Sequence, residues 1–177
     1  MRLFTGIAIP PEITTRLVQV MDSVRALPGL RFTPPEKLHL TTTFIGEWPE
    51  ARLEDMQRAL ADVHVQGPLE IHLARLGWMP NPHFPRVLYA GVQSTDALQR
   101  LAKETMQAVI KTGAEPDERR WYRPHVTLAR VGGRPKLNAS PNDEVGDIAT
   151  FQASSFFLYL SANGKYTKLQ EFPMRDS

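Results

Sequence analysis

Two His-x-Thr tripeptides constrain the fold of this chain more than any other feature. They are His39-Leu40-Thr41 and His125-Val126-Thr127, almost half of the 177-residue chain apart. Each lies in a short apolar segment that we interpret as a β-strand, in which successive side chains point to opposite faces. The histidine and the threonine of each motif therefore share one face of a strand, and the residue between them points toward a core.

The order of the predicted elements repeats around these motifs. A strand and then a helix precede each motif strand: 2–9, 12–27 and 38–45 in the first half, and 87–92, 95–111 and 125–131 in the second. The apolar spacing also predicts a helix over 51–63 and strands over 69–76, 148–160 and 166–172, with a polar loop over 132–143 and a hairpin turn at Asn163-Gly164.

This order predicts an α+β fold with two halves related by a pseudo-two-fold axis. We expect two mainly antiparallel β-sheets that face a central cleft, with the helices packed outside. Residues 1–177 are interpreted as a single bilobal domain to which each half contributes one His-x-Thr strand.

Composition excludes several classes of function. The chain contains no cysteine, so it has no disulfide, no thiol nucleophile and no thiolate metal site. No apolar run approaches the ~18 residues of a membrane helix. The net charge of +2 permits an anionic substrate but is too small to indicate a DNA duplex as partner. We expect a cytoplasmic monomer without a membrane partner.

The residue types in the two motifs suit phosphodiester chemistry. Cleavage of a phosphodiester needs a base for the attacking oxygen and an acid for the leaving oxygen. Histidine, with an ordinary pKa of ~6.5, can serve as either near neutral pH. The two threonine hydroxyls can stabilise the charge that develops on the phosphoryl oxygens. This scheme requires no metal and no cofactor.

The sequence around the motifs resembles that of a known family. The resemblance covers the opening strand, the flanks of both motifs and two later segments: 2–9 (RLFTGIAI), 38–47 (LHLTTTFIGE), 85–91 (PRVLYAG), 123–130 (RPHVTLAR) and 164–167 (GKYT). The chain resembles the 2H phosphoesterases, and in particular the bacterial and archaeal RNA 2′,3′-cyclic phosphodiesterases, which are also called 2′-5′ RNA ligase-like proteins. It implies metal-independent hydrolysis of 2′,3′-cyclic phosphates, on RNA ends or on small cyclic nucleotides, to 2′-phosphates.

The resemblance also implies roles for individual residues. His39 and His125 become the catalytic acid–base pair, with His39 assigned as the acid and His125 as the base. Thr41 and Thr127 bind the substrate phosphate. Arg130 is placed at the phosphate as well, although strict alternation puts it on the face opposite His125. Its role therefore requires the strand to end or to bulge before residue 130.

Two neighbouring residues are left out of the predicted site. Alternation from His39 puts Phe44 on the core side, although an aromatic ring near the cleft would suit base stacking. Thr42 stands where the family often has leucine, and it is expected to face away from the cleft.

The motifs leave other functions open. The same four residues would serve a 2′-5′ RNA ligase, or a hydrolase of another cyclic or 2′-5′-linked phosphate. A different class of function is an RNA-end-binding module with little turnover. The presence of both histidines and both threonines counts against that alternative.

Overall fold

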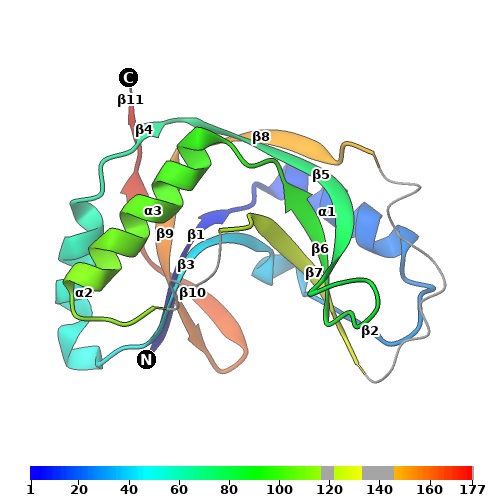
Figure 1. Cartoon of the computed structure of the whole chain (residues 1–177), viewed down its shortest axis with the longest axis horizontal. Coiled ribbons are helices and arrows are strands. Elements are labelled where there is room, and N and C mark those ends of the chain that lie inside the picture. Colours follow the sequence, from blue (N-terminus) through cyan, green and yellow to red (C-terminus); the bar gives the residue numbers. More distant parts are fainter. Residues whose placement is uncertain (117–121, 133–145, 177) are drawn as a thin grey trace.

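The computed structural model describes residues 1–116, 122–132 and 146–176. It shows two large antiparallel sheets, as predicted, and a small parallel pair formed by Gln66–Gly67 and Arg175–Asp176. The motif strands β3 and β7 contact each other where the two large sheets meet (Figure 1). The first sheet has the order β10 (Lys165–Pro173), β9 (Ser155–Ala162), β1 (Arg2–Ala8) and β3 (His39–Glu47). The second has the order β2 (Leu30–Phe32), β7 (His125–Val131), β6 (Val87–Val92), β5 (Leu69–Met79) and β8 (Ala149–Ala153). The α+β fold class is confirmed.

The strand arrangement is equivalent in the two sheets. In the first, β1 leads through α1 (Pro11–Ser23) and β2 to its antiparallel neighbour β3. In the second, β6 leads through α3 (Asp96–Lys111) to its antiparallel neighbour β7. Each motif histidine is the first residue of the second strand of such a pair. This equivalence of strand order and motif position is the pattern that the pseudo-two-fold prediction requires.

The helices cover the sheets on their outer sides. Figure 1 shows α2 (Leu53–Ala61) and α3 together at one side of the molecule and α1 at the other. Helix α3 packs on β3, and α1 packs on β8. The N-cap of α3 is Thr95, whose Oγ1 accepts a hydrogen bond from the Leu98 backbone N–H at 3.2 Å. Among the described residues, no helix is both long and apolar enough to cross a lipid bilayer.

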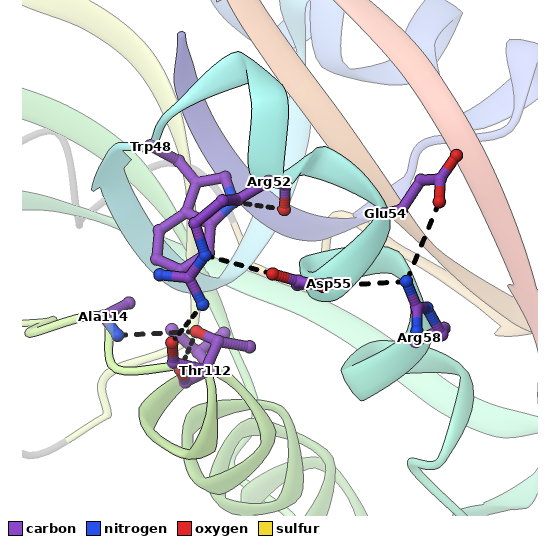
Figure 2. Close-up of polar contacts among 8 residues, drawn as sticks. Trp48, Arg52, Glu54, Asp55, Arg58, Thr112 and Ala114 are labelled. Atoms are coloured by element: carbon purple, nitrogen blue, oxygen red, sulfur yellow. Dashed lines mark hydrogen bonds and ion pairs between the residues drawn. The ribbon is translucent and has the colours of Figure 1, made fainter.

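Figure 2 shows how the beginning of α2 is attached to the end of α3. The Arg52 guanidinium donates to the Thr112 carbonyl oxygen at 2.9 Å and to the Asp55 carboxylate at 3.0 Å. It also lies over the indole of Trp48, 4.6 Å from the ring centroid. Because α3 packs on β3, this contact helps to fix the helices behind the first motif strand.

The first predicted helix is too long at its C-terminal end. Helix α1 ends at Ser23, whereas the apolar spacing predicted helix as far as Leu27. Val24 has φ −110° and ψ 7° and has left the helical conformation. Val24 and Leu27 nevertheless pack against the core, so a turn here reproduces the apolar spacing of a helix.

The strand predicted over 148–160 is also wrong, because it is two strands in different sheets. Ala153 ends β8 and pairs with Leu69 in the second sheet, whereas Ser155 begins β9 and pairs with Pro173 in the first. The buried positions are Phe151 and Ala153 in β8 but Phe156 and Leu158 in β9, so the alternation shifts by one residue where the chain passes from one sheet to the other. The short strands β2, β4 (Gln66–Gly67) and β11 (Arg175–Asp176) were not predicted. The loop predicted over 132–143 lies, except for its first residue, outside the described residues.

The hairpin between β9 and β10 has the turn that its sequence predicts. Asn163 and Gly164 have φ values of 53° and 71°. Positive φ at both central residues defines a type I′ turn, whose twist matches that of the flanking strands. The turn places β10 beside β9, so that β10 forms the outer edge of the first sheet.

Candidate active site

The backbone holds both motif histidines in the same way. Nδ1 of His39 lies 2.7 Å from the carbonyl oxygen of Lys37, and Nδ1 of His125 lies 2.7 Å from that of Arg123. A carbonyl oxygen can only accept, so each Nδ1 carries a proton and donates it. This fixes the tautomer of each neutral ring and leaves Nε2 as the nitrogen that can exchange a proton with a substrate.

The first motif is already joined internally by a hydrogen bond. Nε2 of His39 lies 2.8 Å from Oγ1 of Thr41, two residues further along the same face of β3. The neutral ring accepts this bond from the hydroxyl, and the protonated ring donates it. The hydroxyl and the imidazole can thus act on one bound group.

The two motifs also lie close to each other. The carbonyl oxygen of Thr41 accepts a hydrogen bond from the Tyr122 hydroxyl at 2.8 Å, and Tyr122 precedes the second motif by three residues. The carbonyl oxygen of Thr127 accepts a corresponding bond from the Thr33 hydroxyl at 3.0 Å. Side-chain hydroxyls therefore satisfy the backbone of both motifs at equivalent positions.

A β-bulge follows the threonine in both motif strands. In β7, Thr127 pairs with Tyr89 and Ala129 with Leu88, so Leu128 is the extra residue. In β3, Thr41 pairs with Gly6 and Thr43 with Thr5, so Thr42 is the extra residue. The residue after Thr and the one that follows it are buried in both strands. Each bulge shifts the later residues of its strand to the opposite face.

The bulge in β7 puts Arg130 on the same face as His125 and Thr127. Arg130 pairs with Val87, and Val87, Tyr89 and Gly91 share one face of β6 because they are two residues apart. Tyr89 pairs with Thr127 and Gly91 with His125, so Arg130 shares their face. The role predicted for Arg130 required a bulge before residue 130, and the strand has one. The Arg130 side chain is exposed.

The bulge in β3 puts Phe44 on the same face as His39 and Thr41. The prediction that Phe44 faces the core is therefore wrong. Phe44 pairs with Phe4, which shares a face of β1 with Gly6 and Ala8, the partners of Thr41 and His39. Its ring is 67% exposed, although it is large and apolar. Thr42, by contrast, is buried as expected. Phe44 is therefore the positional counterpart of Arg130.

Aromatic side chains surround His39. Its ring centroid lies 4.8 Å from that of Phe4 and 5.1 Å from that of Tyr166, and the Tyr166 ring stands perpendicular to it. The Tyr159 ring stacks on that of Phe4, with the centroids 4.9 Å apart, and lies 6.1 Å from that of His39. In the second motif, Tyr89 makes an edge contact with His125 at 5.7 Å.

Burial lowers the pKa of the His39 imidazole below its ordinary value of 6.5. The bond to the Lys37 carbonyl opposes this effect, and positive charge on His125 and on Lys37 adds to it. The two imidazoles are therefore close enough to disfavour the doubly protonated pair. In the free protein, the first motif presents a neutral histidine near pH 7.

Protonation of His39 should make the stability of the protein depend on pH. Because the folded-state pKa is below 6.5, the unfolded chain binds the proton more tightly. The stabilisation by neutral His39 is complete above pH 6.5 and decreases as the pH falls through the folded-state pKa. We expect the free energy of unfolding of His39→Gln, measured in urea, to decrease less than that of the wild type over this interval. The exposed His64→Gln variant is the control, and equal pH dependence in wild type and His39→Gln would contradict the shift.

The close approach of β1 to β3 requires glycine at position 6. A Cβ atom on Gly6 would lie 2.8 Å from the carbonyl oxygen of Leu40, so Gly6→Ala must push β3 away. We expect the free energy of unfolding to fall by about 1–3 kcal/mol, and turnover to fall because His39 moves with β3. Denaturation and initial rates measure both effects. Gly146→Ala, where an added Cβ meets no atom within 4 Å, is the control and should match the wild type. A Gly6→Ala variant as stable and active as the control would refute this requirement.

The two equivalent His-x-Thr strands form one candidate site, and comparison with known proteins identifies the chain as a phosphoesterase and shows its family. The family model described as LigT like Phosphoesterase matches residues 7–89. An RNA 2′,3′-cyclic phosphodiesterase of Archaeoglobus fulgidus is 31% identical over 157 residues, which cover 89% of this chain and 84% of the relative. One of Thermus thermophilus is 35% identical over 138 residues, covering 73% and 68%.

Solved structures agree with this result. The crystal structure of the Thermus thermophilus protein TT0787 superposes with a TM-score of 0.83 at 29% identity, and covers 99% of both chains. Escherichia coli LigT complexed with 3′-AMP has the same fold, with a TM-score of 0.80 at 23% identity over 98% of this chain and 97% of that one. The chain belongs to the family of LigT-like phosphoesterases, as its sequence indicated.

Proposed function

We propose that the protein hydrolyses 2′,3′-cyclic phosphates, at RNA ends and in small nucleotides, to 2′-phosphates without a metal ion. The observation that carries this proposal is the equivalence of the two motifs. Both histidines donate from Nδ1 to a backbone carbonyl two residues earlier, and both keep Nε2 for proton transfer. The curated relatives, named RNA 2′,3′-cyclic phosphodiesterases, support the choice of substrate.

The reaction needs one neutral and one protonated imidazole. The neutral ring takes a proton from water as the water oxygen attacks phosphorus. The bond between phosphorus and O3′ breaks, and the protonated ring gives its proton to O3′. The products are a 2′-phosphate and a free 3′-hydroxyl. Thr41 and Thr127 donate to the phosphoryl oxygens as negative charge develops on them.

The pKa of His39 favours a reversal of the roles assigned from the sequence. A base must be neutral before it acts, and burial favours neutral His39. Positive charge on His125 lowers the pKa of His39 further, so the pair favours a single shared proton. We therefore propose His39 as the base and His125 as the acid. The assignment of His39 as the acid would require binding of the anionic phosphate to raise its pKa.

Phe44 and Arg130 are proposed to bind the terminal nucleotide at the far end of the motifs. Each lies three residues beyond a motif threonine and on the same face. An exposed aromatic ring can stack on a base, and a guanidinium can stack on a base or pair with a phosphate. This use of Arg130 includes the phosphate role that the resemblance implies.

The products formed in EDTA test the proposal and its rivals. We expect 2′,3′-cyclic AMP to be converted to 2′-AMP at a rate that EDTA does not change. Among the described residues, no group of three or more His, Asp or Glu side chains is placed to hold a metal. Loss of activity in EDTA and recovery with a divalent ion would contradict the metal-free scheme. Formation of 3′-AMP would overturn the choice of leaving oxygen.

The alternatives give different products in the same assay. With a 5′-hydroxyl oligonucleotide added, a 2′-5′ RNA ligase would join it to the cyclic end: its 5′-oxygen attacks phosphorus, the bond to O3′ breaks, and a 2′-5′ phosphodiester forms. A binding module would retain RNA without product. Cytoplasmic location and a monomeric state remain predictions from the sequence.

A further inference from the structure

A cavity of about 700 Å³ opens beside His39, on the side away from Phe44. Its walls come from the end of β1, the beginning of α1, the turn before β3, and strands β9 and β10. A volume of this order suits a nucleotide-sized ligand. Acid–base chemistry on the terminal phosphate does not use this space.

Two lysines, Lys37 and Lys168, line the cavity together with the aromatic side chain of Tyr166. Lys37 Nζ lies 4.6 Å from the ring centroid of Tyr166, which itself makes the perpendicular contact with His39. Lys168 is two residues beyond Tyr166 on β10 and lines the same cavity, and its Nζ lies 4.4 Å from the ring centroid of Phe157, from which the flexible side chain can turn toward a phosphate. Glu36 also lines the cavity, so one carboxylate stands against two lysines. Lysine ammonium groups bind phosphates, and exposed aromatic rings stack on bases in single-stranded RNA.

The shape of ribose indicates what would enter the cavity. A 2′,3′-cyclic phosphate spans C2′ and C3′, while the base is on C1′ and the chain continues through C5′ on C4′. C1′ and C4′ lie on opposite sides of the ring oxygen. With the phosphate at His39 and Thr41 and the base toward Phe44, C5′ points toward the other end of the motif. That end is the beginning of β3, where the cavity lies.

We propose that this cavity binds the nucleotide on the 5′ side of the cyclic end. Lys37 and Lys168 contact the phosphodiester between the last two nucleotides, and Tyr166 stacks on the upstream base. Both kinds of substrate are turned over, and this additional site makes an oligoribonucleotide with a cyclic end a better substrate than a free cyclic nucleotide. This inference rests on the proposed function, because it assumes that the terminal cyclic phosphate lies at the two motifs.

The test compares a mononucleotide with a dinucleotide. The substrates are 2′,3′-cyclic AMP and adenylyl-(3′→5′)-adenosine 2′,3′-cyclic phosphate. We expect the wild type to show a kcat/KM at least about fivefold higher for the dinucleotide, from one added phosphate contact and one stacked base. Lys168→Met should remove most of this preference and change the mononucleotide rate by less than about twofold, since the ammonium lies outside the motifs. Lys165→Met is the matched control, because Lys165 is exposed on the same strand but does not line the cavity.

Salt dependence gives a second readout that a structural role would not change. Each phosphate neutralised on a single strand contributes a slope of about −0.7 in log affinity against log salt. Lys168→Met should reduce the slope for the dinucleotide by about this amount, and Lys165→Met should not. Equal kcat/KM for both substrates in the wild type, or an equal loss on both in Lys168→Met, would overturn the upstream site while leaving the proposed function intact. Absence of turnover on either substrate would overturn the proposed function itself.

Discussion

Replacement of His39 by alanine is expected to lower kcat for 2′,3′-cyclic AMP by about 10²–10⁴-fold, the range for loss of a general acid or base. The physical reason is that, in the proposed mechanism, Nε2 accepts the proton of the attacking water, and the bond from Nδ1 to the Lys37 carbonyl holds the ring for this role. Binding of the substrate should change much less, because Thr41 and the second motif remain. Initial rates across substrate concentrations separate kcat from KM.

A substrate with a better leaving group distinguishes the two histidines. The p-nitrophenolate of bis(p-nitrophenyl) phosphate leaves without a proton, so an acid is not needed while a base still is. We expect the defect of His39→Ala to persist on this substrate and that of His125→Ala to shrink. The opposite pattern would restore the roles assigned from the sequence. His64→Ala, an exposed histidine outside both motifs, is the control, and an unchanged rate in His39→Ala would refute the two-histidine mechanism.

Removal of the Thr41 hydroxyl is expected to lower kcat by about 10²–10³-fold, the effect of losing one donor to a developing oxyanion. Thr41→Val keeps the shape of the side chain and removes the group that bonds Nε2 of His39 at 2.8 Å. The stability of the protein should change little, since Thr41 is only partly buried. Single-turnover rates on 2′,3′-cyclic AMP give the effect on the chemical step.

The adjacent threonine provides a matched control. Thr42 is buried, and its hydroxyl bonds that of Thr5 at 2.6 Å. Thr42→Val should therefore lower the free energy of unfolding by about 1 kcal/mol and leave kcat near the wild-type value. A similar loss of kcat in both variants would show that the hydroxyl of Thr41 acts through the strand rather than on the phosphate.

Local patterns in the sequence were sufficient to predict the motif strands and the helices behind them. The strand β7 begins at His125 and ends at Val131, as alternation and flanking residues predicted. The helix α3 begins after Thr95, and Gly113, with φ of 89°, follows its end, because short-range capping and backbone freedom determine helix limits. The Asn163-Gly164 turn likewise depends only on the backbone conformations that these two adjacent residues favour.

The same local reasoning failed for Phe44, because a bulge depends on the partner strand. Alternation within β3 puts Phe44 on the core side, but Thr42 is an extra residue relative to β1 and reverses the order. In β7, the adjacent apolar pair Leu128-Ala129 breaks the alternation and is a signal of the bulge. The corresponding pair in β3, Thr42-Thr43, is polar and gave no such signal; Thr43 instead bonds Thr105 of α3.

The sequence by itself determined which residues form the two motifs and which of them share a face, because His39 and Thr41, like His125 and Thr127, need only an extended strand to do so. Tertiary structure decided which further residues join them. The bulges bring Phe44 and Arg130 to that face, and the pairing of Ser155 with Pro173 places β9 in the first sheet. Both depend on hydrogen bonds between strands that are distant along the chain, and no periodicity within one strand records its partner.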